Sequence, residues 1–555
     1  MSADIEQVKL KAKMPEDIQR ILNLPVKASS FPNLTSQLKK AEGTMQLRPI
    51  QNEMLVRAAV NKGLLALVGV GEGKTLTTFL LPLVMGAKKP LLLIPASMRS
   101  QAVDDFYEYN KHFNLPTHLE LRSYEEISTQ PGLLNRIQPD LIVADEVHKI
   151  KNPNSTRTRR IKRYFQWCRR NNVPSPMFAG LSGSITSTSL MDFWHLSSWA
   201  LKYNSPLPLK WAYVSAWAAA IDKSKRPDRK DLMSLAPIMR KFNTSDVREA
   251  FKRNLHNAKG VVISTKGFPP TQLVLESKSE KLSKPIELAL ARASETWQTP
   301  DGDELDCALS LVRLKRQLVC GFYYYWDWPN EPDTEWLEAR KNWNKECREY
   351  IKTAPEGMDT PALLERALIA TFNGEVQLRF PKSVFEAYLE WAKVKDRPLP
   401  PVGTRWICSS FLKNVQTWAE AQSEPPLIWY EHGAVAQGLQ HLTGWTNYAR
   451  GPIADAALVG VNTPHTALIS IKAHSQGKNL QAWGNSIVAH PLSDAARWEQ
   501  LLGRYHRQGQ TRKQVSATIY NYSEFAAALL SARQGAEYIT ESTGLEQRLT
   551  RSVWV

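Results

Sequence analysis

The fold of this chain is decided by the stretch "LLALVGVGEGKTLTTFLLPLV" (Leu64–Val84), in which one apolar run ends in a glycine-rich segment and a second apolar run follows. A strand, a glycine loop and a helix in this order form the context of a phosphate-binding loop, whose backbone N–H groups and helix dipole hold the β-phosphate. The full pattern has a glycine six residues before the lysine, and this chain has Val68 there. Two interpretations stay open at this point, a phosphate cradle and a plain glycine turn before a helix.

A second motif, "LIVADEVHKI", begins at Leu141. Its apolar residues deliver Asp145 and Glu146 to the carboxyl end of a strand, where ligands bind in open α/β sheets. Two adjacent acids at a buried strand end are costly unless they meet a cation or a reactive water. We expect Asp145 to hold Mg²⁺ together with the Thr75 hydroxyl, Glu146 to polarise the attacking water, and Lys74 to contact the β- and γ-phosphates. This motif favours the phosphate cradle over the turn.

The third motif is "QLLGRYHRQGQ" (Gln500–Gln510). On a helix, Gln500, Arg504 and Arg507 share one face because they are spaced i, i+4 and i+7. The segment is either a plain amphipathic helix or the source of arginine fingers that reach a γ-phosphate. Gly503 and the Gly-Gln ending favour the arginine fingers.

Charge is the informative feature of the composition. The 555 residues predict three to four domains, and 71 Lys+Arg against 54 Asp+Glu leave a net charge of +17. This balance favours a polyanionic partner, nucleic acid before membrane. Nine Lys/Arg and no acid lie between Lys149 and Arg170, either on a solvated helix face or in contact with phosphates. The aromatic run "GFYYYWDWP" (Gly321–Pro329) either stacks on bases or packs within a helical domain, and packing is the commoner use.

Cysteine usage and hydropathy indicate the compartment. The five cysteines form no CxxC pair, which argues against a zinc module or a disulfide framework and suits a reducing environment. The first residues lack the apolar core of a secretory signal, and no uncharged apolar stretch reaches the roughly 18 residues of a membrane span. We expect a monomer in the cytoplasm, which for a viral protein is that of the host cell.

Short apolar runs separated by helical patterns predict two α/β blocks with parallel sheets on either side of a helical middle. The expected strands are 64–69, 90–96, 140–146 and 177–183 in the first block, and 426–432, 466–471, 485–491 and 514–522 in the second. The expected divisions of the chain are an N-terminal helical extension (1–45), a first lobe (46–200), helical insertions (201–400), a second lobe (401–525) and a helical tail (526–555).

The order of the motifs resembles that of superfamily 2 DExH helicases, and within them the Swi/Snf-type DNA translocase ATPases, in a compact form like the bacterial and phage members. The segments that carry the resemblance are "LRPIQ" (47–51), "GEGKT" (71–75), "LLLIPASMRSQ" (91–101), "LRSYEEI" (121–127), "DEVHKIKNPNS" (145–155), "LSGSITST" (181–188), "SLVRLKRQLVCG" (310–321), "HSQGKNLQAW" (474–483) and "QLLGRYHRQGQ" (500–510). The chain departs from the family pattern at Val68, at Ser184-Ile185 and at Lys478, and none of these departures removes a catalytic group.

The resemblance implies two RecA-like lobes that close on ATP and Mg²⁺ and move along duplex DNA. The catalytic residues would be Lys74, Glu146, Arg504 and Arg507; the ATP-binding residues Gln51 at the adenine, Gly71, Gly73, Lys74, Thr75, Gly477 and Gln500; the metal ligands Thr75 and Asp145; and the DNA contacts Arg99, Ser123, Tyr124, Lys149, Lys151 and Ser182.

Three other functions compete with a duplex-DNA translocase. A strand-separating or branch-migrating helicase of the same superfamily shares all of these motifs. A non-catalytic DNA-binding protein on a helicase fold would not need the intact Lys74, Asp145, Glu146, Arg504 and Arg507. A P-loop metabolic kinase leaves the second lobe unexplained.

Overall fold

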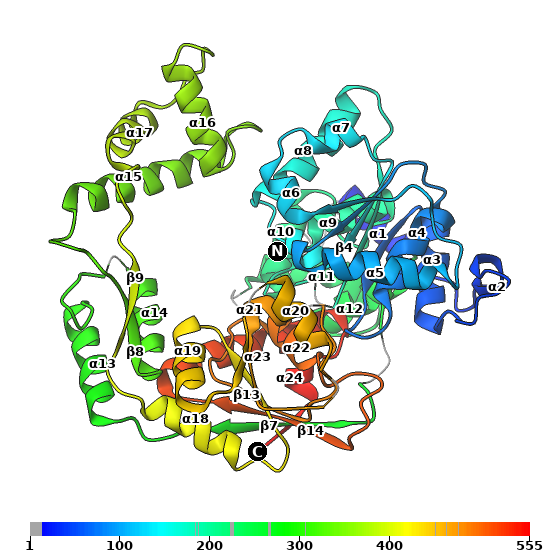
Figure 1. Cartoon of the computed structure of the whole chain (residues 1–555). Helices are drawn as coiled ribbons and strands as arrows, with labels where there is room; N and C mark the ends of the chain where they lie inside the picture. Colours follow the sequence, from blue (N-terminus) through cyan, green and yellow to red (C-terminus); the bar gives the residue numbers. More distant parts are fainter. Residues whose placement is uncertain are drawn as a thin grey trace, which may run out of the picture.

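The protein folds into two α/β lobes and a separate helical arm (Figure 1). The structure, a computed structural model, describes residues 14–555 apart from 184, 187, 223–226, 265–267, 306, 450, 462 and 476, and leaves the side chains of 452, 455 and 459 undescribed. Both large sheets contain only parallel pairings, so the expected α/β fold with two RecA-like parallel-sheet lobes is confirmed.

The first lobe is a six-stranded sheet of order β3-β2-β4-β5-β1-β6. Its strands are β1 (Gly63–Leu67), β2 (Pro90–Ile94), β3 (Glu120–Ser123), β4 (Leu141–Asp145), β5 (Met177–Ser182) and β6 (Val261–Ile263). Its helices are α1 (Glu16–Leu22), α2 (Thr35–Leu38), α3 (Pro49–Asn61), α4 (Lys74–Met85), α5 (Arg99–Asn110), α6 (Tyr124–Thr129), α7 (Leu133–Ile137), α8 (Thr156–Arg170), α9 (Trp194–Leu201), α10 (Trp211–Ile221), α11 (Arg229–Lys241) and α12 (Val247–Asn257).

Strand β1 shows why these segments form a buried sheet. Leu64 and Ala66 pack with α3 and α4 on one face, while Leu65 and Leu67 pack with α8 and α9 on the other, as the two-residue period of a strand requires. All five residues of β1 are buried, and so are those of β2 and β4. Burial on both faces explains their continuous apolar sequence.

The second lobe is a seven-stranded sheet of order β11-β12-β10-β13-β14-β7-β15. Its strands are β7 (Gln272–Lys278), β10 (Leu427–Tyr430), β11 (Thr446–Tyr448), β12 (Ala467–Ser470), β13 (Asn485–Val488), β14 (Gln514–Tyr520) and β15 (Val553–Trp554). Its helices are α13 (Lys284–Thr296), α14 (Ala308–Val319), α18 (Ser410–Glu420), α19 (Gly433–Thr443), α20 (Pro452–Val459), α21 (Ile471–His474), α22 (Ala495–Leu502), α23 (Ser523–Thr543) and α24 (Arg548–Arg551).

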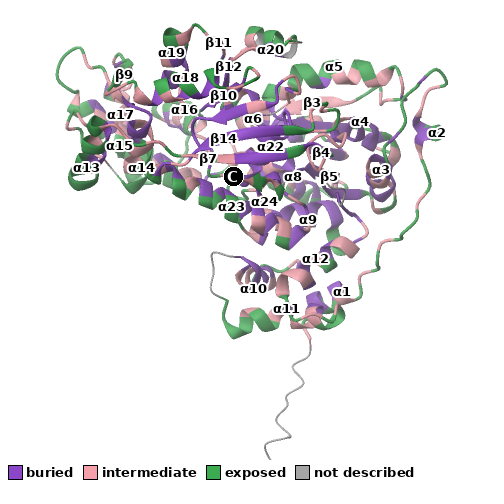
Figure 2. Cartoon of the chain, turned by 90° about the horizontal axis from the view of Figure 1, so that it is seen from below, coloured by how far each residue is buried: buried purple, intermediate pink, exposed green. Residues whose placement is uncertain are grey.

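The two lobes pack against each other. One hydrophobic cluster includes Leu65 and Ile142 of the first sheet together with Trp429 and Val488 of the second. Figure 2 shows the buried strands between helices whose outer faces are exposed. The two lobes therefore share an apolar core and form one body.

The arm comprises α15 (Thr334–Ile351), α16 (Pro361–Phe372) and α17 (Lys382–Val394), and it stands on an antiparallel ribbon of β8 (Phe322–Trp326) and β9 (Val402–Trp406). It has an apolar core of its own, which contains Trp343, Leu368 and Tyr388. Figure 1 shows the ribbon leading from the second lobe to the arm.

The sheets draw strands from outside the boundaries expected from the sequence. β6 and β7 lie within 201–400, yet β6 extends the first sheet and β7 pairs with β14 in the second, so both lobes reach into the expected insertion. The C-terminal tail contributes β15 to the second sheet. The aromatic run is the strand β8 and not part of a helix, and its first two residues are buried. Among the described residues no helix is long and apolar enough to cross a membrane.

Candidate functional site

The glycine loop lies between β1 and α4, as its sequence predicts. Gly71 and Gly73 have φ values of +90° and +82°, which residues with a Cβ rarely adopt. The Nζ of Lys74, the first residue of α4, donates to the carbonyls of Val68 (2.9 Å) and Gly69 (3.0 Å). The carbonyls of the loop thus hold the ammonium at the N-terminus of α4. A helix N-terminus favours a bound anion, so a phosphate could bind beside this ammonium.

Gln51 is fixed by two hydrogen bonds, one to the N-cap of its own helix and one to this loop. Its Oε1 accepts from the backbone N–H of Arg48 at 2.8 Å, and its Nε2 donates to the carbonyl of Gly73 at 2.9 Å. A Cβ on residue 73 would lie 2.3 Å from that Nε2, so a glycine is needed for the approach. Arg48 also reaches the loop, donating to the carbonyl of Gly71 at 2.7 Å. Arg48 was not among the expected site residues, although its place three residues before Gln51 is that of a helix N-cap.

The two acids stand at the carboxyl end of β4. Glu146 has φ +54°, a left-handed conformation that is costly for a residue with a side chain and that clusters at functional sites. Its Oε2 accepts from the hydroxyl of Ser182 at 3.3 Å and lies 3.2 Å from Nδ1 of His148. Ser182 was expected to contact DNA, whereas in the structure its hydroxyl orients this carboxylate.

Burial makes the two carboxyls unequal. Burial, reinforced by the neighbouring Glu146, raises the pKa of Asp145 above its ordinary value. Burial also raises the pKa of Glu146, but the hydrogen bond from His148 and the charge of Lys74 outweigh it and leave that pKa below its ordinary value. Glu146 is therefore the ionised member of the pair, as a base that accepts a proton from water must be.

Arg504 faces this pair from the second lobe. It is 6% exposed, and its guanidinium donates to the carbonyls of Gln500 (2.9 Å) and Lys478 (3.1 Å). Burial, with the nearby Arg507, lowers the pKa of Arg504 to about 10, while Glu146 opposes the shift. Arg504 therefore stays charged at neutral pH and lies close enough to Glu146 to stabilise its ionised form.

The lobes meet at the glycine loop. A Cβ on residue 71 would lie 3.7 Å from Cβ of Arg507, and one on residue 503 would lie 3.1 Å from Cβ of Val70. Gly477, expected to bind ATP, has the side chains of Met98 and Gln101 as its nearest neighbours, so it borders the first lobe beside α5. The structure thus gathers Lys74, Asp145, Glu146, Arg504 and Arg507 from distant parts of the sequence at one interlobe crevice. Thr75 follows Lys74 in the chain, and Gln500 binds Arg504 through its backbone carbonyl.

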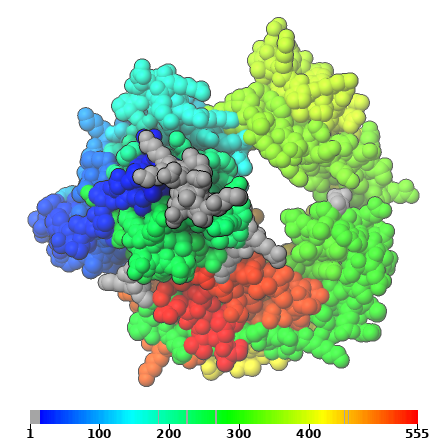
Figure 3. All heavy atoms as spheres, turned by 180° about the vertical axis from the view of Figure 1, so that it is seen from behind, coloured from blue at the N-terminus to red at the C-terminus, as the bar shows by residue number. Residues whose placement is uncertain are grey.

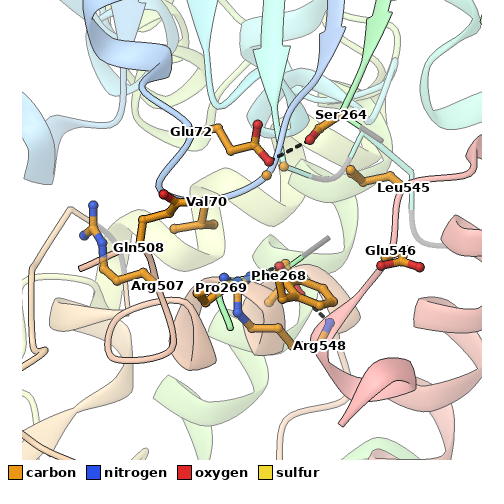
Figure 4. A pocket seen from close by; sticks show the side chains of 13 residues that line it. Val70, Glu72, Ser264, Phe268, Pro269, Arg507, Gln508, Leu545, Glu546 and Arg548 are labelled. Carbon is orange, nitrogen blue, oxygen red and sulfur yellow. Dashed lines mark hydrogen bonds and ion pairs between the residues drawn. The ribbon is translucent and has the colours of Figure 1, made fainter. Parts of the chain in front are cut away.

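A pocket opens beside this crevice (Figure 4). The Oε1 of Glu72 on the loop accepts from the hydroxyl of Ser264 at 2.6 Å. On the opposite wall, the Arg548 guanidinium lies 4.9 Å from the centre of the Phe268 ring and pairs with buried Glu499. The C-terminal segment around Arg548 therefore borders the glycine loop, a contribution that no motif in the sequence indicated.

The donor set fits a magnesium ion bound together with a polyphosphate. Among the described residues no group of three His, Cys, Asp or Glu could hold a metal alone. Mg²⁺ in such sites takes one or two protein oxygens and completes its shell with phosphates and water. The Asp145 carboxylate and the Thr75 hydroxyl are oxygen ligands of this kind, and a cation beside Asp145 would lower the pKa that burial has raised.

Half of the residues expected to contact DNA are buried. Ser123 caps α6 by accepting from the N–H of Glu126, Tyr124 donates its hydroxyl to the carbonyl of Asp145 at 2.7 Å, and Ser182 is wholly buried. In this conformation the three side chains are enclosed by protein, and their contact with DNA stays a prediction. Arg99 is half exposed and pairs with Glu126 at 3.1 Å.

Lys149 and Lys151 are half-buried in the turn after Glu146, and they stay candidates for DNA contact. Burial lowers the pKa of Lys149, and the charges near it include Glu146 and, from the second lobe, Arg497. Comparison with known proteins adds nothing to this geometry, since the sequence matches no protein-family model and no curated protein.

Proposed function

We propose that this chain is an ATP-driven motor of superfamily 2, of the Swi/Snf type, which hydrolyses ATP between its two lobes to move along duplex DNA and remodel it or displace bound protein. One observation carries the proposal. Lys74 and Glu146 of the first lobe and Arg504 of the second share one crevice, although more than 350 residues separate the last two in sequence. A motor needs a reaction that both lobes complete together.

Each residue has a role in this proposal. The loop N–H groups and Lys74 would bind the phosphates, and Glu146, aligned by Ser182 and His148, would take a proton from the attacking water. Arg504 and Arg507 would stabilise the charge that develops on the γ-phosphate. A bound Mg²⁺ would supply positive charge to the β- and γ-phosphate oxygens. Loss of the γ-phosphate would remove an anion that groups of both lobes contact.

The choice of DNA as the track rests on charge and on the motif resemblance. The chain has a net charge of +17. The turn that carries Glu146 continues into Lys149 and Lys151, so a phosphate bound there would lie next to the catalytic carboxylate. This adjacency offers a physical route from DNA binding to hydrolysis.

ATPase assays with duplex, forked and single-stranded DNA, combined with displacement of a triplex-forming strand, test the proposal. We expect stimulation that grows with duplex length and displacement of the third strand without unwinding. Stimulation by single strands alone would favour the strand-separating helicase. Absence of hydrolysis under all conditions would favour a non-catalytic DNA-binding protein.

A matched pair of variants tests the assigned base. Glu146→Gln keeps the size of the side chain and removes the base, so hydrolysis is expected to fall at least 100-fold while ATP still binds. Glu295→Gln changes an exposed glutamate of α13 in the same way and is expected to leave hydrolysis unchanged. Equal activity of the two variants would refute the mechanism.

A further inference from the structure

An opening passes through the molecule. Figure 3 shows it between the first lobe, the arm and the second lobe. The ribbon of β8 and β9 ties the arm to the second lobe, and the tip of the arm returns to the first lobe. The three parts therefore form a closed ring, which the linear order of the motifs did not predict.

The ring is closed by a polar contact that we name the latch, formed by residues 351–359 of the arm and by α8 with the turn before α7. At its centre is Asp359, which has no exposed surface. Its carboxylate accepts from Arg160 at 2.6 Å and from Arg163 at 2.8 Å. Arg160 is itself 3% exposed, so this is a buried and bidentate type of contact, which fixes geometry more strictly than a surface ion pair.

Further hydrogen bonds surround this pair. Arg159 donates to the carbonyls of Ile351 and Lys352, the latter at 2.6 Å. The Thr156 hydroxyl donates to the carbonyl of Asp359 at 3.1 Å. The Gly132 N–H donates to the Glu356 carboxylate at 2.8 Å, which brings the turn before α7 into the latch.

The latch has the composition of a contact that can open. The arm has an apolar core of its own, and none of its residues belongs to the apolar clusters of the first lobe. The arm can therefore swing on its ribbon without exposing a shared core. Interfaces without a large apolar area are those across which domains move.

The charges of α8 and of the arm indicate which kind of ligand could open the latch. Helix α8 has seven Lys/Arg and no acid, whereas the arm, residues 334–394, has nine Lys/Arg and ten Asp/Glu. The arm is thus not a phosphate-binding surface, although the chain as a whole is strongly basic. Phosphates of a nucleic acid are the same kind of bidentate partner for arginine as the Asp359 carboxylate. A polyanion at α8 therefore competes with the arm for the same guanidiniums.

We propose that the ring encircles double-stranded DNA and that the latch is the gate through which the duplex enters. This inference rests on the proposed function, because it takes DNA as the track. Helix α15, with 18 residues, is about 27 Å long and forms one side of the opening. A motor closed around its track stays bound while the lobe contacts are released in each ATP cycle.

Covalent closure of the latch tests the gate. Pro131 precedes the Gly132 N–H, which donates to the Glu356 carboxylate, and both Pro131 and Glu356 are half-buried. A cysteine at position 356 removes this one hydrogen bond of the latch, which the corresponding single-cysteine control also lacks. Cysteines at both positions, in a Cys307→Ser background that removes the exposed native thiol, can be joined by a reducible bis-thiol crosslinker. The pair leaves Asp359 and its arginines in place. Each single-cysteine variant treated with the same reagent is the matched control.

The substrates are a closed circular duplex and a linear duplex of the same sequence with free ends. We expect crosslinked protein to lose at least 10-fold of its ATPase stimulation by the circle while it still responds to the linear duplex, and reduction to restore the response to the circle. Equal stimulation of crosslinked protein by both DNAs would overturn the gate.

A retention assay separates failure of the gate from failure of the proposed motor, since it needs no hydrolysis. Protein is loaded on circles, crosslinked and washed at high salt. We expect it to stay on the circle and to be released when a restriction enzyme linearises the DNA. Equal release from circular and linear DNA would refute encirclement. Retention on circles without any DNA-stimulated hydrolysis would support encirclement of the duplex and refute the proposed motor function.

A charge variant tests the gate without a crosslink. Asp359→Asn keeps the shape of the side chain and removes its charge, so it is expected to load onto circles several-fold faster and to leave them several-fold faster than the parent protein. Glu375→Gln, on an exposed turn of the arm, is the matched control and is expected to behave like the parent. Unchanged rates for Asp359→Asn would show that the latch does not limit entry.

Discussion

The close approach of the lobes at Gly503 allows one sharp prediction about the catalytic cycle. This residue follows α22 of the second lobe and lies against Val70 on the glycine loop of the first. An alanine Cβ there would lie 3.1 Å from both Cβ and Cγ1 of Val70. These distances are shorter than the optimal separation of two non-bonded carbon atoms, which is about 3.5–4.0 Å. Gly503→Ala therefore forces the lobes apart by a few tenths of an ångström.

The expected loss follows from the cost of overpacking. Inserting a methyl group into a packed contact costs about 1–3 kcal/mol. If this cost is paid only in the closed state in which the reaction occurs, kcat falls by about 5- to 150-fold, since each 1.36 kcal/mol corresponds to a factor of ten. Binding of ATP to the loop of the first lobe should change much less, because the loop N–H groups and Lys74 are untouched.

Val70→Gly provides the compensating change. It removes the Cβ and Cγ1 atoms that the new methyl meets, whereas the contact of that methyl with the carbonyl of Glu499, at 2.9 Å, lies within the second lobe and would remain. The test is a double-mutant cycle, in which steady-state kcat and the ATP dissociation constant are measured for the parent protein, both single variants and the double variant. We expect the loss caused by Gly503→Ala to shrink at least fivefold in the Val70→Gly background. An unchanged kcat for Gly503→Ala, or an equal loss in both backgrounds, would refute closure of the lobes as the reactive state.

Three further predictions concern buried ionisable side chains. Arg504→Ala should lower kcat by about 10³-fold with less than a tenfold change in ATP affinity, measured by single-turnover hydrolysis and equilibrium binding. His195, whose pKa burial lowers to about 4, donates from Nε2 to a backbone carbonyl and is neutral in the folded protein. The unfolded chain takes up that proton as the pH falls from 6.5 towards 4, so His195 alone should lower the free energy of unfolding by about 3 kcal/mol over this window. In urea titrations the free energy of unfolding of His195→Gln should fall by about that much less than that of the parent protein. Glu499→Ala leaves Arg548 buried without its carboxylate and should cost about 3–5 kcal/mol, seen as a lower Tm, whereas replacing both residues by methionine should cost less. An equally low Tm for Glu499→Ala and for the double methionine variant would contradict a stabilising role of the Glu499–Arg548 ion pair.

The strands of the two sheets illustrate what local sequence can predict. Each of the eight strands expected from an apolar run exists within two or three residues of its expected bounds, because a strand buried on both faces must be apolar throughout. β7, with the sequence "QLVLESK", has only a three-residue apolar run and ends in charge, so it resembled part of the helical middle. Its place next to β14 is set by pairing across more than 230 residues, which no local pattern reports.

The site residues also differ in whether local sequence can predict their place. Lys74, Asp145 and Glu146 were predictable because each sits at a defined end of a local element, a loop before a helix or the last residues of a strand. Ser123 and Tyr124 were expected at the DNA only from the motif resemblance, and the structure places them at the end of β3 and the start of α6. The structure buries Tyr124 because the side chain turns back under β4 to bond the carbonyl of Asp145. Position at a strand end thus locates a residue near the site without deciding which way its side chain points.

The arginines of α8 mark the limit of charge as a predictor. A run of nine Lys/Arg without an acid looks like a phosphate-binding surface when only the run is considered. Arg159, Arg160 and Arg163 are instead occupied by the arm, whose Asp359 lies about 200 residues further along the chain. Lys162, Arg169 and Arg170 on the same helix stay exposed. Neutralising these three should therefore weaken DNA binding and reduce its salt dependence without opening the ring, whereas neutralising Asp359 should open the ring first.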